Sequence, residues 1–200
     1  MPYKIIFMGT PQFSVPVLES LVKSSYQISC VYTQSPKKSN RGQKLNPSPI
    51  QNCAENLKLA IRSPNNLNTE VELKFFKEVN PDIVVVVAYG QLISKSFLDV
   101  PKKGFINIHA SLLPKWRGAA PIQRAIMNLD NQTGISIMKI TEELDSGPVV
   151  KKIKIEINPS DTSGIVSERL SKIGSQYIVE ALDNICDDKY KLEEQDHKNA

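Results

Sequence analysis

The fold of this chain is constrained most by residues 82–88, which read DIVVVVA. Successive side chains of a strand point to opposite faces, so this segment presents apolar side chains on both faces. A strand with two apolar faces is typical of the centre of a parallel sheet that is covered by helices on both sides. We therefore expect an α/β fold, with a doubly wound, mostly parallel sheet and helices on both faces.

The start of the chain agrees with this expectation. Residues 4–8 form a compact apolar run, a turn follows at Gly9, and apolar side chains then recur at helical spacing over residues 13–22. This pattern predicts a strand, a tight turn and a helix. Many nucleotide-binding folds open in this way, but one glycine at the turn does not make the dinucleotide fingerprint. Neither NAD nor FAD is inferred, and Gly9 is interpreted as a residue that the tight turn requires.

The rest of the chain continues to alternate between strands and helices. The helix at residues 69–79 is expected to turn Val71, Phe75 and Phe76 inward. Residues 187–200 are charged and lack an apolar period, so they are interpreted as a linker or tail. Further strands are expected at residues 27–33, 58–62, 104–108, 134–141 and 148–157, and further helices at residues 50–57, 91–98, 120–128 and 161–185.

Composition and length indicate one sizeable globular domain. The chain has 200 residues, and its 40% hydrophobic content is ordinary for a protein with a packed core. Cys30, Cys53 and Cys186 show no paired or metal-ligand spacing, which indicates reduced thiols. No apolar run is long enough to span a bilayer, and the N-terminus has no signal-peptide core. We expect a cytoplasmic protein without a membrane anchor.

Residues 34–49 are polar and proline-containing, and we expect them to form a long loop. Lys37, Lys38, Arg41 and Lys44 lie together in this loop with no acidic residue among them. A local cationic loop fits a polyanionic partner, and a solvated surface loop explains the charge equally well. Long loops inside compact domains are uncommon and often functional, so the length of this one favours a contact surface.

Polar side chains follow the strand expected at residues 104–108. Alternation places Asn107 and His109 on the same side of that strand, and an acidic turn that contains Asp145 follows the next strand. Ligands of open α/β sheets bind beyond the carboxyl ends of the strands. An amide, an imidazole and a carboxylate are therefore expected above one edge of the sheet.

These three residue types suit the transfer of an acyl group to an amine. The attacking amine must lose a proton, and a histidine such as His109 can accept it. The Asn107 amide can donate to the carbonyl oxygen as that oxygen becomes negative, and Asp145 can orient the imidazole and stabilise its charged form. Structural roles are open alternatives at this point: a core histidine, an asparagine that bonds a turn, and an aspartate in an Asx turn.

Two further features allow more than one interpretation. Ser111 lacks the surroundings of a nucleophile elbow, so capping or ligand binding suits its hydroxyl better than nucleophilic attack. Trp116 and Arg117 either contact a ligand or anchor their loop by packing. One candidate histidine with widely separated acids gives no metal-ligand spacing, so no metal is expected.

Several motifs resemble a known protein family. The segments INIHASLLPKWRGAAPIQRAI and ELDSG are similar to the Asn-x-His pair, the Ser-Leu-Leu-Pro turn and the acidic turn of the folate-dependent formyltransferase family. The string WRGAAPIQR, the opening IIFMGTPQFSVPVL and the loop RGQKLNPSP resemble the members that act on methionyl-tRNA. The similarity extends from the N-terminus to about residue 185.

The resemblance implies a Rossmann-like formyltransferase fold and a function in translation initiation. The implied reaction transfers a formyl group from 10-formyltetrahydrofolate to the amino group of methionine on initiator tRNA, with Asn107, His109 and Asp145 as the catalytic set. The residues implied to line the folate and formyl pocket are Tyr89, Gly90, Ser111, Leu112, Leu113 and Pro114. Those implied to bind tRNA are Lys37, Lys38, Arg41 and Lys44, with Arg41 at the key position.

The chain departs from the family pattern in two respects. Glu143 stands where family members often have glycine, which can alter the flexibility or the charge of the acidic turn. Family members also continue into a C-terminal β-barrel domain. We therefore expect a catalytic domain at residues 1–186, the start of an interdomain linker at residues 187–200, no barrel, and a monomer.

Other functions compatible with these observations define the alternatives. A related formyltransferase acts on glycinamide ribonucleotide or on an amino sugar, and the basic loop argues against the first of these acceptors. A catalytically idle module that binds folate or RNA is the alternative from another class. A Rossmann-type oxidoreductase shares the fold but requires the glycine fingerprint that this chain lacks.

Overall fold

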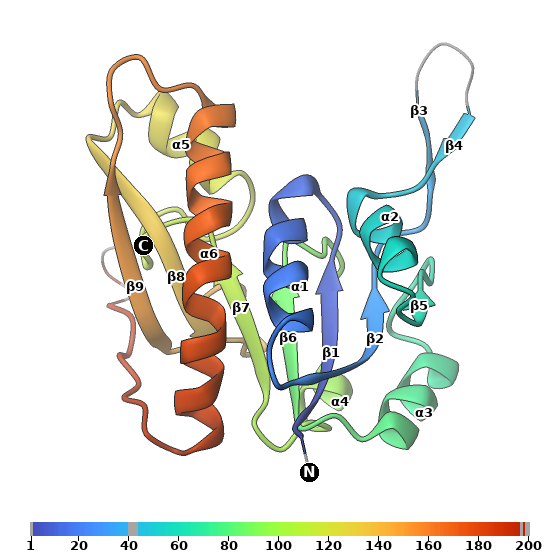
Figure 1. Ribbon diagram of the computed structural model, residues 1–200. Helices are drawn as coiled ribbons and strands as arrows, with labels where there is room; N and C mark the ends of the chain where they lie inside the picture. The colour runs from blue at the N-terminus through green and yellow to red at the C-terminus, as the bar shows by residue number, and fades with distance from the viewer. Residues whose placement is uncertain (1, 40–43, 197, 199–200) are drawn as a thin grey trace.

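The residues that the structure describes, 2–39, 44–196 and 198, form one seven-stranded sheet and a separate two-stranded ribbon in this computed structural model (Figure 1). The order of strands in the sheet is β5-β2-β1-β6-β7-β8-β9. Pairs from β5 to β7 are parallel, whereas β8 runs antiparallel to both of its neighbours, so the expected mostly parallel sheet is confirmed. The strands are β1 (Lys4–Gly9), β2 (Gln27–Tyr32), β5 (Ile61–Arg62), β6 (Ile83–Val87), β7 (Phe105–His109), β8 (Gln132–Lys139) and β9 (Val149–Glu156).

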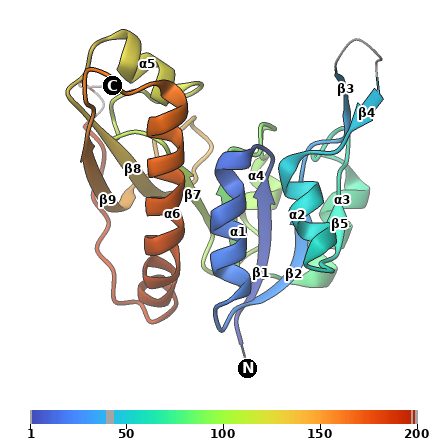
Figure 2. The same cartoon turned by 45° about the horizontal axis from the view of Figure 1, so that its top comes forward.

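Helices cover both faces of the sheet. Helices α1, α2 and α6 lie on one face, and α3 and α4 lie on the other, which confirms the doubly wound arrangement (Figures 1 and 2). None of the helices in the described part of the chain has the length and apolar character needed to cross a bilayer. The helices are the 3₁₀ turn η1 (Gln12–Ser14), α1 (Val15–Val22), α2 (Pro49–Asn56), α3 (Glu70–Val79), α4 (Lys95–Leu98), α5 (Pro121–Met127) and α6 (Ser163–Cys186).

Two apolar cores result from the alternation of side chains in the central strands. In β6, Ile83, Val85 and Val87 face the core beneath α1 and α6, whereas Val84 and Val86 face the core beneath α3 and α4. All five side chains are buried, and burial of one such side chain stabilises the fold by roughly 1.5–3 kcal/mol. The two apolar faces of this strand explain why it occupies the centre of the sheet.

The inward face of α3 differs from the expectation. Val71 is 70% exposed, whereas Phe76 is fully buried and Glu72 lies inward beside it. Arg62 donates two 2.7 Å hydrogen bonds to the Glu72 carboxylate, and Tyr32 donates one of 2.8 Å. The Arg62 hydrogen bonds lower the pKa of Glu72 against the opposing effect of burial. Because the carboxylate is satisfied, Glu72 can face the sheet and Val71 is left outside.

Two other segments also differ from the expectation. Residues 34–49, expected as a loop, contain β3 (Lys37–Ser39) and β4 (Lys44–Asn46), which pair as an antiparallel ribbon. This ribbon projects from the body of the molecule (Figure 1), and Arg41 lies outside the described residues. The helix expected at residues 91–98 is confined to the four residues of α4.

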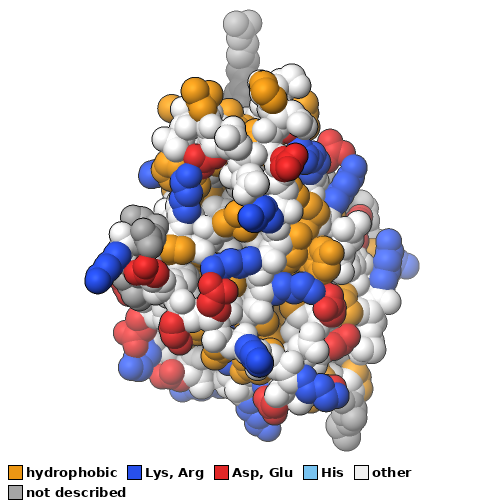
Figure 3. Space-filling model, turned by 90° about the vertical axis from the view of Figure 1, so that its left-hand side faces the viewer, with side chains coloured by type: hydrophobic (Ala, Val, Ile, Leu, Met, Phe, Trp, Pro, Cys, Tyr) orange, Lys and Arg blue, Asp and Glu red, His pale blue; other side chains and the backbone are white. Residues whose placement is uncertain are grey.

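The tail after α6 packs against the edge of the sheet. Val149 of β9 and Glu193 exchange two backbone hydrogen bonds of 2.8 and 2.9 Å. Lys152 pairs with the Glu193 carboxylate at 2.7 Å. Acidic and basic side chains are interspersed with hydrophobic ones on this side of the molecule (Figure 3). Part of the segment expected to form a linker is therefore docked on β9.

Candidate active site

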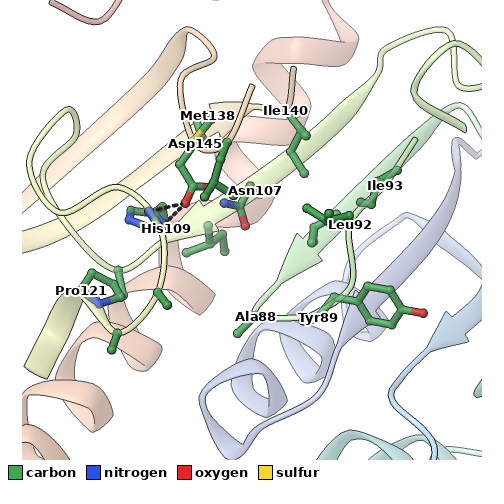
Figure 4. A pocket seen from close by; sticks show the side chains of 18 of the residues that line it. Ala88, Tyr89, Leu92, Ile93, Asn107, His109, Pro121, Met138, Ile140 and Asp145 are labelled. Atoms are coloured by element: carbon green, nitrogen blue, oxygen red, sulfur yellow. Dashed lines mark hydrogen bonds and ion pairs between the residues drawn. The ribbon is translucent and has the colours of Figure 1, made fainter. Parts of the chain in front are cut away.

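A cavity of about 640 Å³ opens beyond the carboxyl ends of β6 and β7 (Figure 4). The loop after β6, the end of β7 and the turn after β8 surround it. Ligand pockets usually measure roughly 300–1,000 Å³, so this cavity has the size for an organic ligand. It lies at the sheet edge where ligands of open α/β folds bind.

Strand β7 delivers two polar side chains to the cavity. Ile106 and Ile108 pack into the core beneath α6, so the alternate residues Asn107 and His109 face the other side and line the cavity (Figure 4). They are only 9% and 6% exposed. The expected placement of both residues on one side of the strand is confirmed.

Both ring nitrogens of His109 face hydrogen-bond acceptors. Nε2 lies 2.9 Å from the backbone carbonyl oxygen of Trp116, and Nδ1 lies 3.5 Å from Oδ2 of Asp145. A carbonyl oxygen and a carboxylate both only accept hydrogen bonds, so we assign the proton of the neutral ring to Nε2, whose contact is the shorter of the two. The lone pair is then on Nδ1, and a proton taken up there faces the Asp145 carboxylate. This arrangement can accept a proton and stabilise the positive charge that results.

The Asp145 carboxylate is held by the backbone of a second loop. Its Oδ2 accepts a 2.8 Å hydrogen bond from the Gly118 N–H. The φ angles are 47° at Asp145 and 81° at Gly118, both in the left-handed region. Glycine adopts this conformation freely, whereas an aspartate does so at a cost in free energy. One charge-assisted hydrogen bond thus joins the acidic turn to the Gly118 loop.

The Asn107 amide is available to a ligand. Its side chain lines the cavity, and within the part of the chain that the structure describes no group forms a hydrogen bond with it. An amide N–H in this position can donate to an oxygen that becomes negative during a reaction. The structure therefore brings Asn107, His109 and Asp145 together around one cavity (Figure 4).

The turn after β6 contributes backbone to the cavity rather than an aromatic face. The Tyr89 ring points away from the cavity (Figure 4) and is 1% exposed, and burial raises the pKa of its hydroxyl above the ordinary value. The Tyr89 carbonyl oxygen accepts hydrogen bonds from Thr10 Oγ1 at 2.8 Å and Gln34 Nε2 at 3.1 Å. Gly90 has a φ angle of 85°, which favours glycine. Tyr89 and Gly90 both border the cavity.

The turn formed by Ser111, Leu112, Leu113 and Pro114 lies outside the cavity lining. The Leu113 N–H donates to Ser136 Oγ at 3.0 Å, and that hydroxyl donates to the Ser111 carbonyl oxygen at 2.8 Å. The Ser111 hydroxyl donates to the backbone of the next loop. These contacts attach the turn to β8, so the turn packs on a strand beside the cavity and not in its lining.

Trp116 and Arg117 are engaged in contacts that anchor their loop. The Trp116 indole N–H donates to Asp130 at 2.8 Å, and Lys115 pairs with the same carboxylate at 2.7 Å. Burial opposes ionisation of Asp130, but hydrogen bonds led by that from Lys115 hold its pKa below the ordinary value. Arg117 Nε donates to Gln195 Oε1 at 2.9 Å. Of the two interpretations of Trp116 and Arg117, the structure favours loop anchoring.

The β3–β4 ribbon carries three of the four basic residues of the expected tRNA contact. Lys37 and Lys38 belong to β3 and Lys44 belongs to β4, while Arg41 lies outside the described residues. The ribbon projects beyond the same end of the sheet as the cavity (Figures 1 and 2).

Sequence reasoning did not find the apolar side of the cavity. Its lining includes Leu92, Ile93, Met138, Ile140 and Leu144. Two of these, Leu92 and Leu144, are 78% and 61% exposed, and clustered exposed apolar side chains often mark a ligand surface. Leu144, an apolar residue inside an otherwise polar acidic turn, is the sequence signal that could have indicated this apolar side. Among the described residues, no group of three or more His, Cys, Asp or Glu side chains is arranged to hold a metal ion.

Comparison with known proteins gives both a family match and close relatives. The sequence model of the formyl transferase family matches residues 3–182. A methionyl-tRNA formyltransferase of Pelagibacter ubique is 55% identical over 201 residues, covering 100% of this chain and 65% of the relative. That of Mesorhizobium japonicum is 50% identical over 183 residues, covering 91% of this chain and 58% of the relative. The chain thus spans less than two thirds of the length of these relatives.

Solved structures of low sequence identity share the fold. Glycinamide ribonucleotide transformylase 1 from Symbiobacterium toebii matches with a TM-score of 0.77 and 14% identity, covering 98% of this chain and 95% of that one. An N-formyltransferase from Helicobacter canadensis in complex with folinic acid and dTDP-3-aminofucose matches with a TM-score of 0.75 and 19% identity, covering 100% and 69%. At these identities the likeness shows the fold alone.

Proposed function

Because the chain belongs to the formyl transferase family, we propose that it transfers the formyl group of 10-formyltetrahydrofolate to the amino group of methionyl-initiator tRNA, giving formylmethionyl-tRNA for translation initiation. The observation that carries the proposal is the meeting of Asn107, His109 and Asp145 at a cavity with the size for an organic ligand. The acceptor is inferred from relatives at 55% and 50% identity that are named for methionyl-tRNA.

His109 is the proposed proton carrier. The acceptor amine must lose a proton when it attacks the formyl carbon, and Nδ1 of His109 accepts that proton. When the tetrahedral adduct collapses, the bond between the formyl carbon and the folate nitrogen breaks, and His109 returns the proton to that leaving nitrogen. The Asp145 carboxylate, 3.5 Å away, stabilises the imidazolium. The Trp116 carbonyl oxygen holds Nε2 at 2.9 Å and so fixes the orientation of the ring. Proton transfer by a positioned group of this kind contributes about 10²–10⁴-fold to a rate.

Asn107 is the proposed donor to the developing oxyanion. The formyl oxygen gains negative charge as the amine adds, and a hydrogen bond that strengthens with this charge lowers the barrier. The Asn107 amide faces the cavity and is not occupied by another described residue. It therefore needs no rearrangement of protein hydrogen bonds to reach the formyl oxygen.

The cavity fits a folate as the formyl donor. Leu92, Ile93, Met138 and Ile140 form an apolar side that can pack against the faces of a flat ring, and Asn107, His109 and Asp145 are among the polar residues that line the cavity. When bound, the folate supplies a formyl group carried on nitrogen. We place the ring system between the β6 turn at Gly90 and the turn after β8. The folinic acid in the Helicobacter canadensis protein supports this choice of donor.

The β3–β4 ribbon is the proposed contact for the tRNA acceptor. Lys37, Lys38, Arg41 and Lys44 carry four positive charges over a short segment, and phosphate contacts dominate nucleic-acid affinity. The ribbon extends from the same end of the sheet as the cavity (Figure 1). A polynucleotide held on the ribbon can therefore present its 3′ end to the site.

The proposal is tested by comparing formyl acceptors. The chain is incubated with 10-formyltetrahydrofolate and, in parallel, with methionyl-initiator tRNA, glycinamide ribonucleotide or an amino-sugar nucleotide. We expect kcat/KM for methionyl-tRNA to exceed the other two values by at least about 10²-fold, since discrimination by several polar contacts reaches this size. A higher value for either small acceptor, or no transfer to any acceptor, contradicts the proposal.

A further inference from the structure

Gln195 is a buried residue in an exposed segment. Its side chain belongs to the tail that docks on β9, and the residue is 5% exposed although Glu194 and Asp196 on either side are exposed. Buried amides are usually retained only where their donors and acceptor are satisfied. The contacts of Gln195 therefore indicate what its burial achieves.

The Gln195 amide bonds to two different loops at once. Its Oε1 accepts a 2.9 Å hydrogen bond from Arg117 Nε. Its Nε2 donates to the backbone carbonyl oxygens of Asp145 at 2.9 Å and Gly147 at 2.7 Å. Both donor hydrogens and the acceptor are thus in use, and all three partners belong to the loops that border the cavity.

These contacts enclose the hydrogen bond that holds the Asp145 carboxylate. Arg117 directly precedes Gly118, whose N–H donates to Asp145 Oδ2 at 2.8 Å. Gln195 therefore bonds to the segments of both partners of that hydrogen bond: to the Gly118 loop through Arg117, and to the Asp145 turn through backbone carbonyl oxygens. Asp145 also has the left-handed φ of 47°, a conformation that persists only where the surroundings hold it. The Gln195 bond to the Asp145 carbonyl oxygen is one such restraint.

Pairing of the tail with β9 fixes the position of Gln195. The two backbone hydrogen bonds between Val149 and Glu193 lie two residues before it. The Lys152–Glu193 ion pair of 2.7 Å lies on the same stretch. The docked tail and the acidic turn are consequently joined by hydrogen bonds.

We propose that Gln195 is a positioning residue that fixes the Asp145 carboxylate against His109 by joining the Gly118 loop to the Asp145 turn. Its kinetic consequence rests on the function proposed above, whereas its effect on the Gly118–Asp145 hydrogen bond does not. A role limited to fastening the tail affects the stability of the tail but leaves that bond and the work of Asp145 unchanged.

The first test measures hydrogen exchange at the Gly118 amide in the full chain and its variants. Gln195→Ala removes all three hydrogen bonds, and Gln195→Met keeps the volume of the side chain without its amide. Glu194→Ala, an exposed neighbour, is the matched control. We expect exchange at Gly118 to accelerate at least about tenfold in both Gln195 variants, because loss of a restraint favours local opening. Amides of β6 and the Glu194→Ala protein should exchange as in the wild type.

Unchanged exchange at Gly118 in Gln195→Met overturns the proposal. This result does not depend on catalysis, so the inference can fail while the proposed function stands. The reverse also holds, since accelerated exchange in a chain without formyl transfer leaves the positioning role intact and removes the function.

The second test is a double-mutant cycle on formyl transfer. Gln195→Met should lower kcat about 10–100-fold, the range expected when a reacting group is slightly misplaced, while KM for the folate changes less than about threefold. In an Asp145→Asn background the same substitution should have no further effect on kcat, because both changes remove one function. Independent, multiplying losses contradict an action of Gln195 through Asp145.

Discussion

The Trp116 carbonyl oxygen determines which nitrogen of His109 can act. In a Ser-His-Asp triad the carboxylate binds the protonated nitrogen and the opposite nitrogen takes the proton. Here Nε2 is committed to a backbone carbonyl at 2.9 Å, and the nitrogen that can accept a proton is the one beside Asp145. In the proposed mechanism, Asp145 therefore acts on the proton itself rather than on the far side of the ring.

Asn107 offers a direct test at the same scale. Asn107→Ala should lower kcat by about 10²–10³-fold, the usual effect of removing one oxyanion donor, while KM for the folate changes little. Steady-state formylation of methionyl-tRNA measures both constants. Asn52→Ala, an exposed asparagine on α2, is the control and should behave as the wild type. An Asn107→Ala enzyme with wild-type kcat contradicts the assigned role.

Gly118 tests the backbone geometry independently of catalysis. Its φ of 81° disfavours any residue with a Cβ, although an added Cβ meets only Leu144 at 3.6 Å. Gly118→Ala should therefore lower the free energy of unfolding by about 1–3 kcal/mol, measured by urea denaturation.

Gly164 in the first turn of α6 provides the matched control for Gly118. Its φ is not in the left-handed region, and a Cβ there meets only Thr162 Oγ1 at 3.7 Å. Gly164→Ala should raise stability by about 0.4–1 kcal/mol because it restricts the unfolded chain. Equal effects of the two substitutions would show that the left-handed conformation at Gly118 carries no cost.

The predictable part of the site consists of residues tied to strand ends. Alternation along β7 placed Asn107 and His109 together, and the turn after β8 supplied Asp145. The contacts of Gln195 could not be predicted from the sequence, because they join positions 117, 145 and 195 and no periodic pattern links these positions. The turn at Ser111 was expected in the pocket, but its hydrogen bonds to Ser136 tie it to β8 instead.

At the scale of secondary structure, α3 is held to the sheet by a charged residue as well as by apolar ones. Glu72 pairs with Arg62 at 2.7 Å, and their side chains are 10% and 30% exposed. Hydrogen bonds to a charged group of this kind contribute about 1.5–3 kcal/mol. Glu72→Gln should therefore lower the free energy of unfolding by about 1–3 kcal/mol near pH 7.

The pH dependence of this difference has a definite sign. Arg62 lowers the pKa of Glu72 in the folded protein, so the folded state binds the proton less readily than the unfolded chain, whose glutamate titrates near about 4.3. The stabilisation is complete above that value and declines as the pH falls through it. Urea denaturation between pH 7 and pH 3 should show wild type and Glu72→Gln converging. A gap that is constant over this range contradicts the assignment, and Glu70→Gln, exposed on the same helix, is the control.

Elements with a strong apolar pattern were predictable, and those without one were not. Strands β1 and β6 are continuous apolar runs, helix α6 has apolar side chains at helical spacing, and each lies where it was expected. The β3–β4 ribbon is short and polar, so it has no apolar pattern from which its pairing could be predicted. The outward position of Val71 depends on Arg62 and Tyr32, which are distant in sequence, and a local pattern cannot show this.

On the scale of the whole molecule, the proposed function separates acceptor binding from chemistry. We consider the variant in which alanine replaces all four of Lys37, Lys38, Arg41 and Lys44. Its binding to methionyl-tRNA should be weaker. The slope of log affinity against log salt should fall by about 0.7–0.9 for each phosphate that the ribbon no longer neutralises. KM for the folate should stay the same, because the ribbon is proposed to hold the tRNA and the cavity to hold the folate. Filter binding over a salt series measures the slope.

A charge-matched control separates local contact from net charge. Lys154 is exposed on β9, at the opposite edge of the sheet from β5, so Lys154→Ala removes one positive charge far from the ribbon. It should leave the salt slope unchanged. If Lys154→Ala reduces the slope as much as Lys38→Ala does, tRNA binding follows net charge and the ribbon is not its site.

The most direct test of the central claim is single-turnover formylation of methionyl-initiator tRNA by the wild type and by His109→Ala, with folate affinity measured on the same preparations. We predict that the substitution slows formyl transfer by about 10²–10⁴-fold while the dissociation constant of the folate changes less than about threefold. Transfer at the wild-type rate in His109→Ala would contradict the account, because the account assigns the proton transfer to His109.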